Sequence, residues 1–317
     1  MIWDKLKTLF VFTLLVLSLP LLAMDYTIPT PYSNLEKNDV ERLLAHDNIK
    51  YLSANDTEFV SIYSEYMSAQ FKGVVLLIPD WEKSPMNNAG INFLRKNLNQ
   101  LGYTTYAMAV PDINWNASKK KTTTEQLDPI ASTEKPASNN QPNNADAQEG
   151  NTPEQEEVAT QPHYVDAIPN MSNTILDDYK KQLITRYESL HTHAMLSQPE
   201  NLIVIAQGAS AGALIEYYAN FPNTNINAFV SLSSYLPNTE RNQSLNQTTS
   251  LISPALLDIF YSNDNEAIID GFKDRQRWVN RNSKFDYRQR ELFGLSNQPD
   301  QQQRLIKEID GFLRRLF

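Results

Sequence analysis

Short apolar runs alternate with amphipathic stretches along most of the chain, and the runs have the length of strands. The runs 73–79 and 202–206 are almost wholly apolar, which is typical of strands buried on both faces of a sheet. Similar runs predict further strands at 104–110, 228–232, 255–260 and 285–288. The stretch 57–66 predicts an antiparallel strand at the edge of the sheet.

Between these runs, apolar side chains recur at the spacing that places them on one face of a helix. Ile91, Leu94 and Leu98 are one such set, and Gly102 follows as a helix stop. The predicted helices are 91–101, 176–190, 210–220, 271–279 and 305–316. This alternation predicts an α/β fold, a mostly parallel sheet with helices on both faces.

One polar stretch interrupts the pattern between residues 117 and 161. It is rich in Asn, Gln, Pro, Glu and Thr, and it contains no aromatic residue. Such a segment buries too little apolar area to offset the entropy lost on ordering. We therefore predict a disordered insertion at 117–161 in a single domain, whose two parts are residues 24–116 and 162–317. A segment that binds a partner is the alternative.

The N-terminal residues 1–23 have the layout of a secretory signal peptide. Lys5 and Lys7 precede an apolar run that starts at Leu9, and Ala23 is a small residue suited to cleavage. The run is shorter than the roughly 20 residues that span a bilayer, which disfavours the alternative of an uncleaved anchor. The sequence predicts a mature periplasmic protein with no membrane span.

Composition narrows the classes of function. The chain has 37 acidic and 28 basic residues and a net charge of −9, which disfavours nucleic acid as a partner. It has no cysteine, so disulfides, thiol catalysis and Cys-ligated metals are excluded. No cofactor or metal is predicted, and the expected partner is an unidentified small molecule or a protein of the cell envelope.

A G-x-S-x-G motif, Gly208 to Gly212, directly follows the strand predicted at 202–206. This motif, the order of elements and the Pro79-Asp80-Trp81 loop after an early strand resemble the α/β-hydrolase superfamily over residues 57–317. The chain is similar to an uncharacterised secreted gammaproteobacterial branch of it, whose elbow often lacks the serine. The resemblance implies a nucleophile on a sharp turn between strand and helix, and an oxyanion loop at Asp80 and Trp81.

Two registers of the motif are possible, and they differ in chemistry. In one, Ser210 is the nucleophile. In the other, Gly208 occupies that position, so that Gln207, Gly208 and Ala209 form a degenerate elbow with no attacking group. The strand ends at Ala206, two residues before Gly208, which favours the second register. Glycine also adopts without cost the positive φ that the elbow requires.

The histidines give an independent test, because the resemblance implies an acid and then a histidine after the nucleophile. Asp264 matches the acid, but no histidine follows His193. His191 and His193 end the helix before the strand at 202–206, so they lie at its amino end, roughly 20 Å from the elbow. His163, in the segment after the insertion, is the alternative base, and His46 has no assigned role.

Three functions remain open. The first is a catalytically degenerate α/β-hydrolase fold that acts by binding, which the residue at 208 and the missing histidine support. The alternative is a serine ester hydrolase that uses Ser210, Asp264 and an unconventional base. A third possibility is a structural or assembly role in the envelope, which a partner found by pull-down would separate from the first.

Overall fold

The computed structural model describes residues 31–44, 48–81, 83–113, 171–222 and 225–317. The predicted signal peptide at 1–23 and the predicted insertion at 117–161 lie outside these residues, as do His46 and His163. Within the described residues, no helix is both long and apolar enough to cross a membrane.

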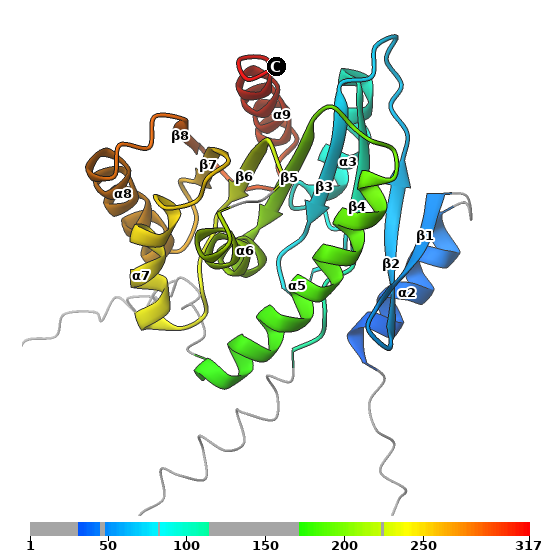
Figure 1. The fold of residues 1–317 in the computed structure, drawn as a ribbon, viewed down its shortest axis with the longest axis horizontal. Helices are drawn as coiled ribbons and strands as arrows, with labels where there is room; N and C mark the ends of the chain where they lie inside the picture. Colours follow the sequence, from blue (N-terminus) through cyan, green and yellow to red (C-terminus); the bar gives the residue numbers. More distant parts are fainter. Residues whose placement is uncertain (1–30, 45–47, 82, 114–170, 223–224) are drawn as a thin grey trace, which may run out of the picture.

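An eight-stranded sheet forms the centre of the molecule (Figure 1). Its order is β1-β2-β4-β3-β5-β6-β7-β8, and all neighbours from β4 to β8 are parallel, whereas β1 and β2 are antiparallel to their neighbours. The strands are β1 (Ile49–Ala54), β2 (Thr57–Ser64), β3 (Gly73–Ile78), β4 (Tyr103–Met108), β5 (Leu202–Gln207), β6 (Ala228–Leu232), β7 (Ala255–Tyr261) and β8 (Tyr287–Leu292). The predicted fold class is confirmed.

The inner strands β3, β4, β5 and β6 are buried at every residue, as their continuous apolar sequences require. Alternate residues of each strand point to opposite faces, so the sheet separates two apolar clusters. Val204 belongs to one cluster, and its neighbours Ile203 and Ile205 belong to the other.

Helices cover both faces of this sheet (Figure 1). Side chains of α5, α6 and α7 pack on one face, and those of α3 and α9 pack on the other. Helix α2 lies beside β1 and β2, and α8 lies against α7 and β7. The helices are α2 (Tyr32–Leu43), α3 (Ile91–Leu98), the 3-10 turn η2 (Asn99–Leu101), α5 (Asn173–Met195), α6 (Gly208–Asn220), α7 (Thr239–Thr249), α8 (Glu266–Arg281) and α9 (Pro299–Leu313).

Two expectations about the elements are corrected, and two helices were not predicted. The antiparallel strand predicted at 57–66 exists as β2, but it is not the edge strand, because β1 pairs with its outer side. The last strand is β8 at Tyr287–Leu292, later than the predicted 285–288. Helices α2 and α7 were not predicted, because their sequences are mostly polar and their apolar faces are narrow.

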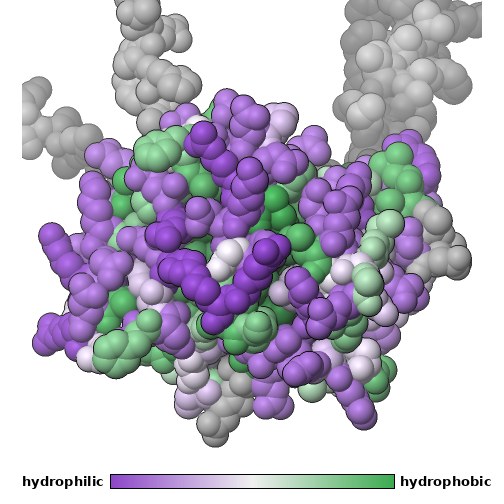
Figure 2. Space-filling model, turned by 90° about the horizontal axis from the view of Figure 1, so that it is seen from above, coloured by the Kyte–Doolittle hydropathy of each residue, from purple (hydrophilic) through white to green (hydrophobic). Residues whose placement is uncertain are grey.

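The two edges of the sheet differ in what they carry. The loops that enter the strands form the amino edge, at the top of Figure 1, and Figure 2 looks onto it. Polar side chains cover most of that face, with apolar ones scattered among them. The loops that leave the strands form the carboxyl edge, where open α/β sheets place their sites.

Candidate functional site

The turn between β5 and α6 is built around a glycine. Gly208 begins α6 directly after Gln207 ends β5, and its φ is +58°. A Cβ atom at Gly208 would lie 2.1 Å from both Cγ and Oδ1 of Asp80, far closer than non-bonded atoms approach. Only glycine fits this position, because the backbone is left-handed and another side chain already fills the space.

That other side chain is Asp80, which follows β3 in the loop that leaves its carboxyl end. Its Oδ1 accepts hydrogen bonds from the backbone N–H of Ala209, at 2.7 Å, and of Trp81, at 2.9 Å. Its Oδ2 lies 3.4 Å from Nζ of Lys83. The residue is only 5% exposed, so its carboxyl group is enclosed by the loop, the elbow and the lysine.

These contacts have opposite effects on the proton affinity of Asp80. Burial is the largest influence and raises the pKa of the Asp80 carboxyl above its ordinary value. The charge of Lys83 and the two backbone N–H groups lower the pKa in part. The start of α6, where Ala209 lies, adds the positive end of the helix dipole.

The two backbone N–H groups that hold Asp80 come from the residue after the elbow and from the loop after β3. α/β-hydrolases build their oxyanion hole from N–H groups at these two places. Here both donors already point to a carboxylate oxygen of the same chain.

Ser210 lies two residues into α6 and is wholly buried. Its Oγ lies 2.7 Å from the hydroxyl of Tyr179 on α5, which is itself 2% exposed. Burial raises the pKa of Tyr179 well above its usual range, so the phenol stays protonated. The side chain of Ser210 therefore faces the contact between α5 and α6.

Asp264 lies at the carboxyl end of β7, at the same edge as the elbow. Its Oδ2 accepts hydrogen bonds from Ser233 Oγ, at 2.6 Å, and from the backbone N–H of Tyr261, at 2.7 Å. Burial raises the pKa of the Asp264 carboxyl, while Ser233, Tyr261 and the charge of Lys83 lower it in part. Lys83 thus acts on two carboxyl groups, that of the buried Asp80 and that of the half-buried Asp264.

His191 and His193 lie near the C-terminus of α5, at the amino edge as expected, and both are half-buried. His191 packs against Tyr187, and His193 packs edge-on against Tyr106. Burial lowers the pKa of His191, which favours its neutral form.

Sequence reasoning missed Lys83 and Ser233. Lys83 is three residues after Asp80 in the loop that the resemblance marks as the oxyanion loop, and that spacing was an available signal. Ser233 directly follows β6 at the carboxyl edge and has a φ of 49°. Its contact with Asp264 is long-range, and no local pattern in the sequence reveals it.

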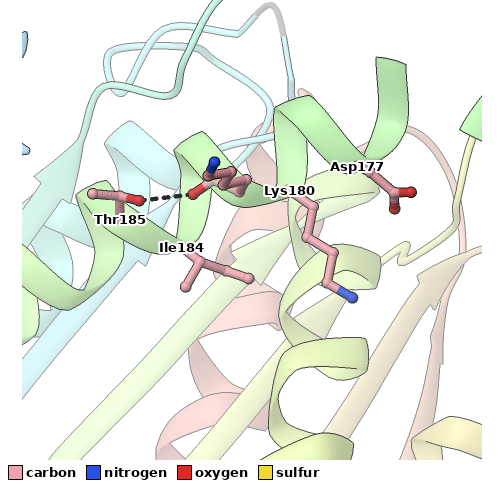
Figure 3. A pocket seen from close by; sticks show the side chains of 5 residues that line it. Asp177, Lys180, Ile184 and Thr185 are labelled. Atoms are coloured by element: carbon pink, nitrogen blue, oxygen red, sulfur yellow. Dashed lines mark hydrogen bonds between the residues drawn. The ribbon is translucent and has the colours of Figure 1, made fainter. Parts of the chain in front are cut away.

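A surface depression of about 340 Å³ lies along α5 and is lined by residues of that helix alone (Figure 3). Two of the charged groups that line it are paired: Lys180 contacts Glu216 at 2.6 Å, and Asp177 contacts Arg241 at 2.7 Å. Burial alone would raise the pKa of Glu216, but Arg241 and Lys180 hold it below the ordinary value. Among the described residues, no group of three or more His, Cys, Asp or Glu could hold a metal ion.

Comparison with known proteins assigns the chain to a family. A family model described as "Protein of unknown function (DUF3530)" matches residues 24–315. The chain belongs to this family. A search of curated proteins with this chain found no significant match.

Solved structures share the fold. A dienelactone hydrolase from Anabaena variabilis matches with a TM-score of 0.53 and 12% identity, covering 85% of this chain and 97% of its own. Est1E from Butyrivibrio proteoclasticus matches with a TM-score of 0.53 and 6% identity, covering 85% and 98%. This DUF3530 protein therefore has an α/β-hydrolase fold, and identities this low show the fold alone.

Proposed function

We propose that this DUF3530 protein is a non-catalytic α/β-hydrolase-fold protein that acts by binding a small molecule or an envelope protein at the carboxyl edge of its sheet. One observation carries the proposal: the carboxyl group of Asp80 accepts hydrogen bonds from the backbone N–H groups of Trp81 and Ala209. It lies in the space that a side chain at Gly208 would otherwise occupy.

Hydrolysis of an ester by this fold needs a nucleophile at the elbow and free donors for the developing oxyanion. Loss of one such donor costs roughly 10²–10³ in rate, and loss of the nucleophile removes most of the acceleration. Gly208 has no side chain with which to attack, and both donors are engaged by the carboxyl group of Asp80. The two features depend on each other, because Asp80 fits only where residue 208 has no Cβ.

The alternative, a serine ester hydrolase that uses Ser210 and Asp264, meets two physical obstacles. The Ser210 hydroxyl is buried and bonded to Tyr179, and Asp264 is bonded to Ser233. A nucleophile must reach its substrate within about 3–3.5 Å, so α6 or α5 would have to move before Ser210 could react.

The compartment is part of the proposal. The apolar, Lys-flanked residues 1–23 read as a signal peptide, and the family match begins at residue 24, directly after them. We propose that the mature protein starts there and is periplasmic.

The test of the catalytic question is labelling by a fluorophosphonate probe and turnover of short-chain p-nitrophenyl esters. The protein is purified after expression of the full chain, alongside Ser210→Ala and the matched variant Tyr179→Phe. We expect neither labelling nor turnover above the uncatalysed rate in any of the three. Labelling and turnover that are present in the wild type and lost in Ser210→Ala would establish the serine hydrolase instead.

A further inference from the structure

Helix α2 is fastened to the carboxyl edge of the sheet by a few polar contacts. At its N-terminus, the backbone N–H and the hydroxyl of Ser33 both donate to Asp112, at 2.9 and 2.5 Å. Lys37 pairs with Glu58 of β2 at 2.8 Å, on the exposed side. Val40 is the only residue of α2 in the apolar cluster on that face of the sheet.

One turn after Ser33, the carboxyl group of Glu36 points inward and is buried. The residue is 4% exposed, and neither of its oxygens has a hydrogen-bond partner. The groups that face it are Ser84 from the loop after β3, whose hydroxyl lowers the pKa of Glu36 in part, Asp112 from the segment after β4, and Arg186 from α5.

Arg186 does not neutralise Glu36 by direct contact. Its guanidinium donates to the carbonyl of Ala109 at 3.0 Å and lies over the ring of Phe59. It makes no ion pair with Glu36, although its charge favours the ionised carboxylate at a distance. The negative charge of Asp112 acts in the opposite sense.

A buried carboxylate with no hydrogen bond is costly, whereas the neutral acid is tolerated. Docking of α2 is therefore favoured when Glu36 is protonated. When Glu36 is ionised, exposure of its carboxylate to water is favoured. We propose that α2 is a pH-sensitive clasp, which stays docked while Glu36 is protonated and loosens when Glu36 ionises.

The direction and range of the effect follow from linkage. Burial raises the pKa of Glu36 from 4.5 to about 7 in the docked helix, whereas a released helix restores the ordinary value. Below both values the acid is neutral in either state, and docking is strongest. Docking weakens as the pH rises from about 4.5 to about 7, and it changes little above that.

The clasp borders the candidate site. Ser84, which faces Glu36, is the residue after Lys83, and Lys83 contacts Asp80. Release of α2 would remove Glu36 from beside this loop. The loop, which carries Lys83 and Asp80, would then be freer to move, and with it the contact of Asp80 with the N–H groups of Trp81 and Ala209.

Hydrogen exchange on the full chain tests the clasp, with exchange times corrected for the intrinsic effect of pH. The protection of α2 amides in the wild type should fall by about thirtyfold between pH 5.5 and 8. Glu36→Gln stays neutral and should keep the same protection at both values. Glu41→Gln, on the exposed side of the same helix, should behave as the wild type.

Protection in the wild type that does not change with pH, or an equal fall in Glu36→Gln, would overturn the proposal. If Glu36→Gln does not fold, the side-chain carboxyl of Glu36 is titrated by carbon NMR in the wild type. A midpoint near 7 is then the expected result, and a midpoint near 4.5 contradicts the clasp.

Discussion

At the scale of single residues, Gly208 and Asp80 form a matched pair. The glycine lacks the Cβ that would collide with the carboxyl group, and the carboxyl group occupies the volume that a nucleophile would need. Neither residue alone explains the site. A glycine at the elbow leaves a gap, and an aspartate in the loop after β3 needs that gap in order to reach Ala209.

Substitution Gly208→Ala tests this pairing. We expect a loss of about 3 kcal/mol in the free energy of unfolding, because the new Cβ meets Asp80 and the φ of +58° disfavours an L side chain. Denaturant unfolding measures it, with Gly311→Ala as the control. A Cβ at Gly311 meets nothing within 4 Å, so that helical substitution should be neutral or stabilising.

A second substitution separates the two causes. In the background Asp80→Gly the collision is gone and only the backbone strain is left, so Gly208→Ala should cost clearly less there than in the wild type. An equal cost in both backgrounds would show that Asp80 does not fill the elbow.

The sequence anticipated the backbone of the site better than its contacts. The length of the buried strand and the place of the helix located residue 208 at the turn, because both are local properties. The hydrogen bond from the Ala209 N–H to the carboxyl group of Asp80 joins two segments that are 129 residues apart in the sequence. No periodicity in the sequence reports such a contact.

At the scale of elements, strands with continuous apolar sequence were the most predictable. β3, β5, β6 and β7 lie within two residues of their expected bounds, because burial on both faces leaves little freedom in composition. β1 was missed because it is short and half-exposed, and α2 and α7 were missed because their sequences are largely polar. Their positions are decided by long-range contacts, such as that of Ser33 with Asp112.

α8 shows the same dependence on distant residues. Arg275 of α8 is 1% exposed, and its guanidinium lies 3.2 Å from the fully buried Asp258 of β7. The same guanidinium donates to the backbone carbonyl of Ser234 after β6, at 2.8 Å. The contacts fix α8 against the carboxyl half of the sheet, beside the candidate site.

At the scale of the whole molecule, the protein has an α/β-hydrolase fold, and the proposal concerns what its carboxyl edge does. The sheet order is that of the fold, and in the function that we propose Gly208 supplies no attacking group and Asp80 occupies the two backbone N–H donors. Under the proposed binding function, the fold would serve a role other than catalysis, as other widely used folds do.

Export is the prediction that belongs to the full chain. The protein expressed in a gram-negative host should be recovered from the periplasmic fraction, with an N-terminus at or near Met24. N-terminal sequencing and intact mass measure this. A chain that keeps residues 1–23 and stays with the membrane would show that these residues are an anchor.

The most direct test of the central claim is whether the donors on Trp81 and Ala209 are closed in the wild type and open without Asp80. Sodium acetate is titrated into the wild type, Asp80→Ala and the control Asp264→Ala, at constant ionic strength, while the backbone amide NMR signals of residues 81 and 209 are followed. We predict saturable shifts of both amides in Asp80→Ala only. Shifts of the same size in the wild type, or none in Asp80→Ala, would contradict the account.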